Sequence, residues 1–233
     1  MAAKEVEQGV GKAIDYFQDL EDSLEPYLPT DKTARILDVG CGYGRVLAFL
    51  RKLGFTNAVG IDHDASVIAE TRKTFGDSVD VVTDLQGYLD ARRGQFDFIV
   101  LKDVIYYFSI DEVLPLLRAM RLCLKPRGHM YVLVFNGAQF SSSFTMEKDY
   151  GIRRVYNETS LRAVLQDSGF DVIALFGNKW RPKSVKGYIY GGAAAAWRLA
   201  TRAVYTLERG ACPNNPRILT PNVIAIATPK TES

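Results

Sequence analysis

Apolar residues change their spacing several times along the chain, and each spacing predicts a different kind of element. Between residues 6 and 28 they recur every three or four positions, which predicts a helix that ends near Pro26 and Pro29. Short, almost wholly apolar runs then alternate with stretches of helical spacing. Buried strands separated by helices favour a parallel sheet that is covered by helices on both faces.

This alternation extends to about residue 135, and the last third of the chain does not continue it in the same regular way. In the first part we expect strands at 35–39, 58–61, 79–82, 96–101 and 130–135, with helices at 45–53, 65–75 and 110–124, the last of them stopped by Pro126 and Gly128. In the last third we expect a helix at 159–168 capped by Thr159 or Ser160, a strand at 172–176, a helix at 193–207 and a strand at 223–227.

The last two strands are separated by a long excursion. A strand that leaves the sheet and a second strand that returns to it predict a hairpin at one sheet edge. We find no internal repeat and no interdomain linker, so we expect one domain over residues 1–233. Within it we expect an N-terminal helix or lid at 1–30, a ligand-binding core at 34–136 and an insertion in the edge hairpin at 177–221.

The composition is that of an ordinary globular protein, with 47% apolar and 24% charged residues. The net charge is only +2, and acids and bases are interspersed, so no nucleic-acid partner is expected. The first thirty residues carry acids and no apolar run, which predicts no signal peptide. The longest apolar stretch, 188–207, is interrupted by Arg198 and Arg202 and makes a poor membrane span. We therefore expect a cytoplasmic protein.

The chain offers little that could hold a metal. Its three cysteines, Cys41, Cys123 and Cys212, lie far apart and form no C-x-x-C pair, which disfavours zinc and disulfides and favours a reducing compartment. The fifth strand is followed by Asn136 without a preceding aspartate, so the acid pair of a magnesium site is missing there. We expect no metal.

A glycine-rich loop follows the first predicted strand and precedes a helix. Its glycines are Gly40, Gly42 and Gly44. Glycine permits the positive φ values of a tight turn and lets a ligand approach the backbone closely. Amides of such a loop and of the following helix point at the ligand, at the carboxyl ends of the strands. A nucleotide-like ligand is therefore expected here, the alternative being a turn without a ligand.

Asp38 distinguishes between the two common ligands of such a loop. A dinucleotide fingerprint has glycine or alanine in its last place, and this loop has Arg45 there. The carboxylate of Asp38, two residues before the first glycine, would repel a pyrophosphate but would pair with an ammonium group. S-adenosylmethionine carries an ammonium and a sulfonium and no phosphate. We therefore expect S-adenosylmethionine as the cofactor.

Two further aspartates follow strands at the same edge of the predicted sheet. Asp62 ends the second strand at the spacing expected for an acid that accepts from both ribose hydroxyls. Asp84 follows the third strand and is a candidate to accept from the adenine amino group, while the amide of Leu85 reaches a ring nitrogen. The alternatives are a solvated or helix-capping acid for Asp62 and a turn-forming aspartate for Asp84.

These residues stand in the order of a known family. The matching segments are ILDVGCGYGRV at 36–46, VGID at 59–62, VVTDL at 81–85, FDFIVLKDVIYYF at 96–108 and LKPRGHMYV at 124–132. Together they resemble the class I S-adenosylmethionine-dependent methyltransferases, over most of residues 34–136. The resemblance implies a doubly wound α/β fold with a mostly parallel seven-stranded sheet and a reversed last hairpin.

The resemblance also implies roles for single residues. Asp38 would hold the methionine ammonium, directly or through water, and the three loop glycines would shape the pocket. Asp62 would bind the ribose with His63 beside the adenine. Lys102, at the end of the fourth strand, would border the methionine half and the site of methyl transfer.

The segment from Tyr150 to Tyr156 resembles one subgroup of these enzymes, which is associated with the modification of sugars and cell-surface polysaccharides. Many members carry a histidine directly before the Ile-Arg pair, and this chain has Gly151 there. We therefore expect methyl transfer to a small molecule, at an oxygen of a saccharide or a related metabolite. A catalytically silent cofactor-binding protein, an N-methyltransferase of a small amine and, disfavoured by Asp38, an NAD-dependent dehydrogenase are the alternatives.

Candidate groups for the acceptor half of the site are few. Tyr107 and Asp103 follow the fourth strand and are the catalytic candidates, with Lys102 as the alternative ion-pair partner of Asp103. Substrate contacts are expected from Tyr16, Tyr106, Arg153 and Tyr156, with plain aromatic packing as the alternative for the tyrosines.

The predicted helix at 193–207 carries Arg198 and Arg202 one turn apart, and Arg209 follows. A solvated basic stripe on an amphipathic helix explains this pattern most simply. The alternative is contact with an anionic or lipid-linked substrate, which would bring the chain to a membrane surface as a peripheral protein.

Overall fold

The computed structural model of the chain describes residues 17–179, 181–182 and 184–230. Its centre is one sheet of seven strands in the order β3-β2-β1-β4-β5-β7-β6. The strands are β1 (Ile36–Val39), β2 (Ala58–Asp62), β3 (Val79–Val81), β4 (Phe96–Lys102), β5 (Leu124–Phe135), β6 (Phe170–Gly177) and β7 (Asn222–Pro229). The expected doubly wound sheet is confirmed, and each strand of the predicted alternation is present.

The sheet reverses its strand order at β1. Strand β1 pairs in parallel with β2 on one side and with β4 on the other, so that Leu37 lies between Val59 and Ile99. The chain therefore leaves β1 and β4 toward opposite halves of the sheet. In open α/β sheets this switch point opens a crevice beyond the carboxyl ends of the strands, which is where ligands bind.

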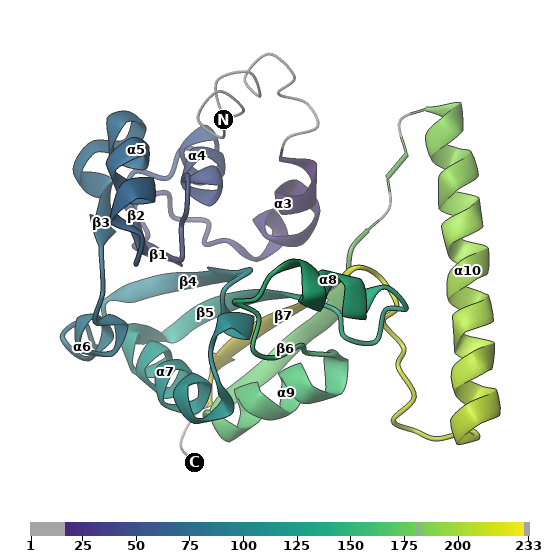
Figure 1. The fold of residues 1–233 in the computed structure, drawn as a ribbon. Helices are drawn as coiled ribbons and strands as arrows, with labels where there is room; N and C mark the ends of the chain where they lie inside the picture. The colour runs from purple at the N-terminus through teal and green to yellow at the C-terminus, as the bar shows by residue number, and fades with distance from the viewer. Residues whose placement is uncertain (1–16, 180, 183, 231–233) are drawn as a thin grey trace.

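Helices cover both faces of the sheet (Figure 1). One face is covered by α3 (Gln18–Ser23), α4 (Arg45–Lys52) and α5 (Ala65–Phe75), and the other by α6 (Leu85–Asp90), α7 (Ile110–Cys123) and α9 (Glu158–Asp167). Leu20 of α3 and Phe49 of α4 pack with Phe98 of β4 in one buried cluster. Leu117 of α7 and Leu161 of α9 pack in another cluster on the opposite face. Two cores with one sheet between them give the rigid layer that holds the loops at its edge.

The carboxyl-terminal strands form the predicted edge hairpin. Strand β7 runs antiparallel between β5 and β6, with Ile226 opposite Tyr131, and β6 forms the edge. The excursion between the two strands contains α10 (Val185–Arg209), which begins eight residues before the predicted helix and continues through Gly191 and Gly192. Ser184 caps it by accepting a hydrogen bond from the Gly187 amide, 3.1 Å away. A capped start and an alanine-rich centre outweigh the cost of two glycines.

Several local predictions differ from the structure. The cap of α9 is Asn157, whose Oδ1 accepts from the amides of Thr159 and Ser160 at 3.0 and 2.9 Å. The cap therefore lies two residues before Thr159, the first of the two predicted capping residues. Strand β5 begins at Leu124 and not at Met130, because the chain pairs with β4 directly after α7. The pairing of the two strands shifts its register between Phe96 and Phe98, and Pro126 lies in this irregular stretch. Helices α6 and α8 (Ser142–Lys148) were not predicted.

Residues 6–16 of the predicted helix at 6–28 lie outside the described residues. Its described part is α3, which ends at Ser23, and a 3-10 turn over Glu25–Tyr27 that contains Pro26. Leu20 and Leu24 are fully buried against the sheet. The Oγ of Ser23 and the hydroxyl of Tyr131 on β5 share a buried hydrogen bond of 2.9 Å. This part of the N-terminal segment is a packing element of the core.

Candidate functional site

The glycine loop between β1 and α4 has a backbone that side chains would not tolerate. Gly40, Gly42 and Gly44 have φ values of +71°, +50° and +78°. A Cβ at Gly40 would lie 2.3 Å from the Cγ2 of Val104, and one at Gly44 would lie 2.5 Å from the Phe75 ring. The conformation of the loop therefore requires all three glycines, and the close approach of neighbouring side chains requires Gly40 and Gly44 in addition.

Backbone groups of β2 hold this loop in place. The amides of Gly40 and Cys41 donate to the carbonyl oxygen of Ile61 at 2.8 and 3.0 Å. The Gly42 amide donates to Oδ2 of Asp62 at 3.0 Å. The loop is thus fixed by the strand beside it, and it presents a preformed wall to the crevice.

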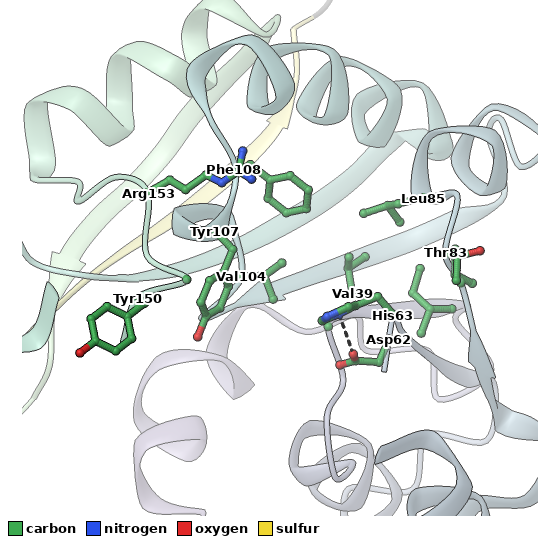
Figure 2. Close-up of a pocket in the computed structure, with 14 residues that line it drawn as sticks. Val39, Asp62, His63, Thr83, Leu85, Val104, Tyr107, Phe108, Tyr150 and Arg153 are labelled. Carbon is green, nitrogen blue, oxygen red and sulfur yellow. Dashed lines mark ion pairs between the residues drawn. The ribbon is translucent and has the colours of Figure 1, made fainter. Parts of the chain in front are cut away.

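A pocket of about 620 Å³ lies at the carboxyl ends of the strands, where the sheet reverses its order (Figure 2). It is lined by Val39, Gly40, Ile61, Asp62, His63, Val82, Thr83, Leu85, Val104, Tyr107, Phe108, Tyr150, Gly151 and Arg153. Figure 2 shows Asp62, Thr83 and Leu85 toward one end and Tyr107 and Tyr150 toward the other. We call these the donor end and the acceptor end. A volume of this size accommodates a cofactor-sized ligand.

Asp38 lies on β1 next to the lining residue Val39, outside the lining residues themselves, and is buried with an unsatisfied oxygen. The residue is 2% exposed, and its Oδ2 has no hydrogen-bond partner among the described residues. Burial raises the pKa of Asp38 to about 7, while Lys102 lowers this pKa and Asp62 raises it further. A buried carboxylate without a partner is costly. A cationic ligand group would supply the missing donor and favour the ionised form.

The end of β2 places Asp62 and His63 on the pocket wall. Oδ1 of Asp62 accepts from the Asp64 amide at 3.1 Å and lies 3.1 Å from Nδ1 of His63, the contact that is dashed in Figure 2. Its Oδ2 accepts from the Gly42 amide. Each carboxylate oxygen has a further lone pair, so Asp62 is oriented by the backbone and still able to accept from a diol. His63 is largely exposed, with 89% of its side chain accessible.

The turn after β3 contributes Val82, Thr83 and Leu85 to the pocket, and Asp84 lies outside the lining residues. Oδ1 of Asp84 accepts from the Gly87 amide at 2.9 Å, which makes Asp84 the cap of α6. In this structure the Asp84 side chain therefore has a local backbone partner and does not line the pocket. Leu85 remains in place beside the pocket.

A hydrogen-bonded pair stands at the acceptor end. The Tyr107 hydroxyl donates to Oδ2 of Asp149 at 2.7 Å, and Oδ1 of Asp149 accepts from the Gly151 amide at 2.9 Å. Burial, followed by the hydrogen bond to Asp149, raises the pKa of Tyr107 to about 12. The same hydrogen bond, followed by that from the Gly151 amide, lowers the pKa of Asp149. Tyr107 is thus a neutral phenol and Asp149 a carboxylate.

The other predicted substrate residues divide between the pocket and the core. Arg153 lines the pocket, and its guanidinium lies 3.1 Å from Glu112 on α7. Tyr106 is 3% exposed, and its ring packs between those of Tyr107 and Phe135, at centroid distances of 4.7 and 4.9 Å. Tyr156 is 1% exposed, and its hydroxyl has no partner among the described residues. The predicted contact through Tyr16 lies outside the described residues. The structure therefore brings neither Tyr106 nor Tyr156 to the pocket.

The sequence matches the model of a family described as Methyltransferase domain over residues 13–175, which is well over half of the chain. The chain belongs to this methyltransferase domain family. The sheet order, the glycine loop and the pocket at its switch point are therefore those of a methyltransferase domain. S-adenosylmethionine is the cofactor expected of it.

Known proteins similar to the chain agree with the fold. Uncharacterized protein RP028 of Rickettsia prowazekii is 29% identical over 109 residues, which are 45% of this chain and 44% of that protein. The match thus spans less than half the length of this curated relative. A SAM-dependent methyltransferase from Archaeoglobus fulgidus has a TM-score of 0.63 and 17% identity, over 97% of this chain and 93% of that one.

Two further structures align over nearly the whole chain. A SAM-dependent methyltransferase from Thermotoga maritima, described as a possible histamine N-methyltransferase, has a TM-score of 0.63 and 16% identity over 98% of both chains. A protein from Haloferax volcanii, named as a methyltransferase in a complex with the Trm112 methyltransferase activator, has a TM-score of 0.66 and 15% identity. That alignment covers 98% of this chain and 97% of the other. Identities this low show a shared fold.

The residues at the donor end of the methyltransferase pocket fit S-adenosylmethionine. The unpartnered Asp38 oxygen suits the ammonium of the cofactor, and the wall at Gly40 leaves no room for a side chain. Asp62 keeps free lone pairs for hydroxyl groups. Among the described residues no three histidine, cysteine or acidic side chains are grouped so that they could hold a metal ion.

Lys102 and Asp103 form an ion pair at the end of β4, as one of the two sequence alternatives has it. Both lie outside the lining residues of the pocket. Asp103 has a φ of +60°, the only positive φ of a non-glycine residue in the described part of the chain. The charge of Lys102 acts on Asp38, whose pKa it lowers.

Eight of the fourteen lining residues were not predicted as site residues: Val39, Ile61, Val82, Thr83, Val104, Phe108, Tyr150 and Gly151. Val82 and Thr83 follow the third strand, and this place at a strand end was a usable signal. Val104, Phe108 and Tyr150 gave no such signal, because apolar and aromatic residues occur as often in a core. Asp149 was one of several polar residues in its segment, and only the structure shows that it bonds to Tyr107.

Proposed function

We propose that this methyltransferase domain transfers the methyl group of S-adenosylmethionine to a hydroxyl oxygen of a small-molecule acceptor, and that the acceptor is a saccharide or a related metabolite. The observation that supports this proposal is the Tyr107–Asp149 hydrogen bond at the acceptor end of the pocket. A hydroxyl acceptor must lose its proton as it is methylated, and this pair offers a route for that proton.

The donor end would hold the cofactor by three groups. Asp38 would pair with the ammonium, since its buried oxygen lacks a donor. Asp62 would accept from the ribose hydroxyls with His63 at the mouth, and the backbone at Leu85 would contact the adenine. Asp84 is left out of this set, because its carboxylate caps α6. When bound, S-adenosylmethionine supplies a methyl group that the sulfonium already activates.

The acceptor end would position the hydroxyl and receive its proton. The Tyr107 oxygen has lone pairs that can accept a hydrogen bond from the acceptor hydroxyl while its own proton is held by Asp149. As the acceptor oxygen took the methyl group and the bond from that methyl group to sulfur broke, releasing S-adenosylhomocysteine, the acceptor proton would pass to Tyr107 and the phenol proton to Asp149. With a pKa of about 12 Tyr107 acts as a relay and not as a phenolate base. Because methyl transfer depends chiefly on alignment, orientation by Tyr107 contributes as much as proton acceptance.

The shape and chemistry of the acceptor end suit a sugar ring. Tyr107, Phe108 and Tyr150 offer aromatic faces, and Arg153 offers a cation at the rim. Aromatic side chains present a flat apolar face with a polar edge, which matches the apolar face and hydroxyl rim of a pyranose. An anionic substituent on the sugar would find the Arg153 guanidinium, which is 58% exposed.

A small amine is the second candidate acceptor, and Asp149 is the observation that favours it. A carboxylate of lowered pKa beside the pocket would attract a cationic amine. The Thermotoga maritima structure that aligns with this chain is described as a possible histamine N-methyltransferase. Against an amine stands the position of Asp149, which lies outside the lining residues of the pocket and is linked to them through its hydrogen bond with Tyr107.

Methyl transfer from isotope-labelled S-adenosylmethionine would test this proposal on panels of saccharides, phenols and amines, with mass spectrometry of the products. We expect label on a hydroxyl compound, and we expect Asp149→Asn to reduce that transfer while the binding of S-adenosylhomocysteine is unchanged. Label on amines alone would show that the acceptor is a small amine, which is the second candidate. Tight S-adenosylhomocysteine binding without transfer to any panel would support a silent cofactor-binding protein and contradict the proposal.

A further inference from the structure

Helix α10 stands outside the layered body of the molecule (Figure 1). It has 25 residues, and none of them is buried. Three contacts attach it to the body. The Tyr205 hydroxyl donates to the carbonyl oxygen of Ala138 at 3.0 Å, and Arg202 donates to that of Arg217 at 2.8 Å. The Trp197 ring meets Phe140 edge-on, with centroids 5.5 Å apart. A long helix held by so few contacts has a large surface that the described chain does not cover.

The two sides of α10 differ in burial. The partly covered residues are Gly187, Gly191, Ala194, Arg198, Thr201 and Tyr205, which recur every three or four positions and so face the body. The opposite side consists of Val185, Ile189, Gly192, Ala196, Leu199, Ala203 and Leu207, and all seven are exposed. We call these seven residues the outer face. Val185 is 78% exposed and Leu207 84% exposed, at the two ends of the helix.

The outer face is apolar along its whole length, without a charged or hydrogen-bonding side chain. Globular proteins usually turn such a stripe toward the core and leave the polar stripe in water. In α10 the order is reversed, since Arg198, Thr201 and Tyr205 lie on the side that faces the body. The outer face runs from Val185 to Leu207, about 33 Å along the helix axis. An apolar stripe of this length that faces outward marks an interaction surface.

The residues that flank the outer face are aromatic and basic. Tyr188, Tyr190 and Trp197 are 67%, 58% and 54% exposed. The helix has four cations, Lys186, Arg198, Arg202 and Arg209, and the single acid Glu208. Apolar residues on one face with tyrosine, tryptophan, lysine and arginine beside them are typical of helices that lie in a lipid–water interface.

We propose that the outer face of α10 binds the surface of an anionic lipid bilayer, with the helix axis parallel to the membrane plane. The apolar side chains would enter the region between headgroups and acyl chains. The exposed cations Lys186, Arg202 and Arg209 would meet anionic headgroups, while Arg198 stays on the side that faces the body, and Tyr188 and Trp197 would lie at the headgroup level. The charges of the helix and the lipid are complementary, and lysine and arginine near such a surface each add to the attraction.

Two other occupants of this face are less well supported. A second copy of the chain would bring another helix with the same excess of cations, and the middle of the face, with Gly192, Ala196 and Ala203, offers Leu199 as its one large side chain for contact. A helix that crosses the bilayer is disfavoured, because within the described residues no helix is both long and apolar enough to span a membrane. A helix lying on the surface needs no such apolar length.

The exposed apolar surface also continues from α10 toward the pocket. Phe140, which touches Trp197, is 77% exposed, and Phe144 on α8 is 70% exposed. Tyr150, at the acceptor end of the pocket, is 99% exposed.

Co-sedimentation of the full chain with vesicles tests the proposal without any methyl transfer. We expect the chain to sediment with phosphatidylglycerol vesicles at low salt, weakly with phosphatidylcholine vesicles, and less with either as salt rises. The variant Ile189→Glu/Leu199→Glu/Leu207→Glu should bind phosphatidylglycerol vesicles at least about tenfold more weakly. Ile173→Glu makes the same change at an isoleucine of β6 that is 52% exposed, and should bind like the unmodified chain.

A spectroscopic measurement makes the test independent of how the triple variant folds. The chain has two tryptophans, so Trp180→Phe leaves Trp197 as the reporter. Its emission should shift to shorter wavelengths with phosphatidylglycerol vesicles and remain unchanged with phosphatidylcholine vesicles. No sedimentation at low salt, or binding unaffected by the triple variant, would overturn the proposal. So would a lipid-free dimer that the triple variant makes monomeric, because the outer face would then be the contact between two copies.

Discussion

The two ends of the methyltransferase pocket are built differently. At the donor end Asp38 and Asp62 belong to parallel strands, the glycine loop is held by hydrogen bonds to β2, and Asp38 is 2% exposed. At the acceptor end Tyr107, Tyr150 and Arg153 are exposed and come from segments beyond the strands. The sheet therefore fixes the donor end of the pocket. The part that would choose the acceptor depends on loops.

If the two ends act separately, a change at the acceptor end should alter catalysis and leave cofactor binding unchanged. Tyr107→Phe removes the hydroxyl that bonds to Asp149 and keeps the ring. We expect kcat to fall about 100-fold, the lower range for loss of a proton-transfer group, with the Kd of S-adenosylhomocysteine within about twofold. Steady-state kinetics and calorimetry measure the two quantities.

The matched control is Tyr156→Phe, which removes a buried hydroxyl that has no partner among the described residues. Its kcat should stay near that of the unmodified enzyme. If both variants lose kcat equally, the Tyr107–Asp149 pair has no special role in catalysis.

A change at the donor end should have the opposite signature. Asp38→Asn keeps the volume of the side chain and removes its charge, so the cofactor ammonium loses a charge-assisted hydrogen bond in a buried place. We expect the Kd of S-adenosylhomocysteine to rise about 30-fold at pH 8. In Asp84→Asn the new amide can still cap α6, and affinity should change by less than about twofold. Equal losses in the two variants would contradict the separate roles of these acids.

The pKa of Asp38 predicts how cofactor binding depends on pH. In the free enzyme this pKa is raised to about 7, chiefly by burial, and the ammonium pairs with the ionised form. Affinity for S-adenosylhomocysteine should therefore fall by about tenfold for each pH unit below 7 and level off just above it. In Asp38→Asn the slope assigned to this group should disappear. A wild-type affinity that is constant from pH 5.5 to 7.5 would contradict this role of Asp38.

The same raised pKa affects the stability of the cofactor-free chain with the opposite sign. The folded state holds the Asp38 proton more tightly than the unfolded chain, whose pKa is near 3.8. The contribution of Asp38 to the free energy of unfolding should therefore fall as pH rises from about 4 to about 7. At pH 8 Asp38→Asn should raise the stability of the free chain, on the order of 1 kcal/mol or more, while it weakens cofactor binding. Urea denaturation at pH 5 and pH 8 measures this difference.

The smallest expected effect comes from crowding at the acceptor end. In Gly151→Ala the new Cβ would lie 3.1 Å from both the Tyr107 ring and Oδ1 of Asp149, so the pair must shift by a few tenths of an ångström. We expect kcat/KM to fall about threefold with unchanged cofactor affinity, because methyl transfer depends on alignment. Gly192→Ala, on the outer face of α10 with no atom within 4 Å, is the matched substitution and should leave kcat/KM unchanged.

The sequence predicted the donor end better than the acceptor end for a physical reason. Strands buried on both faces must be apolar, and a loop with positive φ must contain glycine, so β1 and the loop at Gly40 leave a clear pattern. The position of Asp38 before that loop then indicates the ligand. At the acceptor end the adjacent tyrosines Tyr106 and Tyr107 are alike in sequence, and only packing decides that the first is buried and the second faces the pocket.

Other differences between prediction and structure arise from competing local forces. The Asp84 carboxylate was expected at the adenine, and a helix that the sequence did not reveal takes it as its cap. Gly191 and Gly192 predicted a late start for the helix in the edge hairpin, yet a cap at Ser184 and a run of alanines carry α10 through them. The partial covering of one face of α10, which defines the outer face by contrast, depends on contacts with distant loops that no local pattern encodes.

Calorimetric titration of the full chain with S-adenosylhomocysteine and with NAD, at pH 8, tests most directly whether the pocket is built for an ammonium-bearing cofactor. We predict one S-adenosylhomocysteine bound per chain with a Kd well below 1 mM, affinity about 30-fold weaker in Asp38→Asn, and no heat from NAD. No S-adenosylhomocysteine binding at millimolar concentration, or NAD binding that Asp38→Asn strengthens, would contradict the assignment of the donor end.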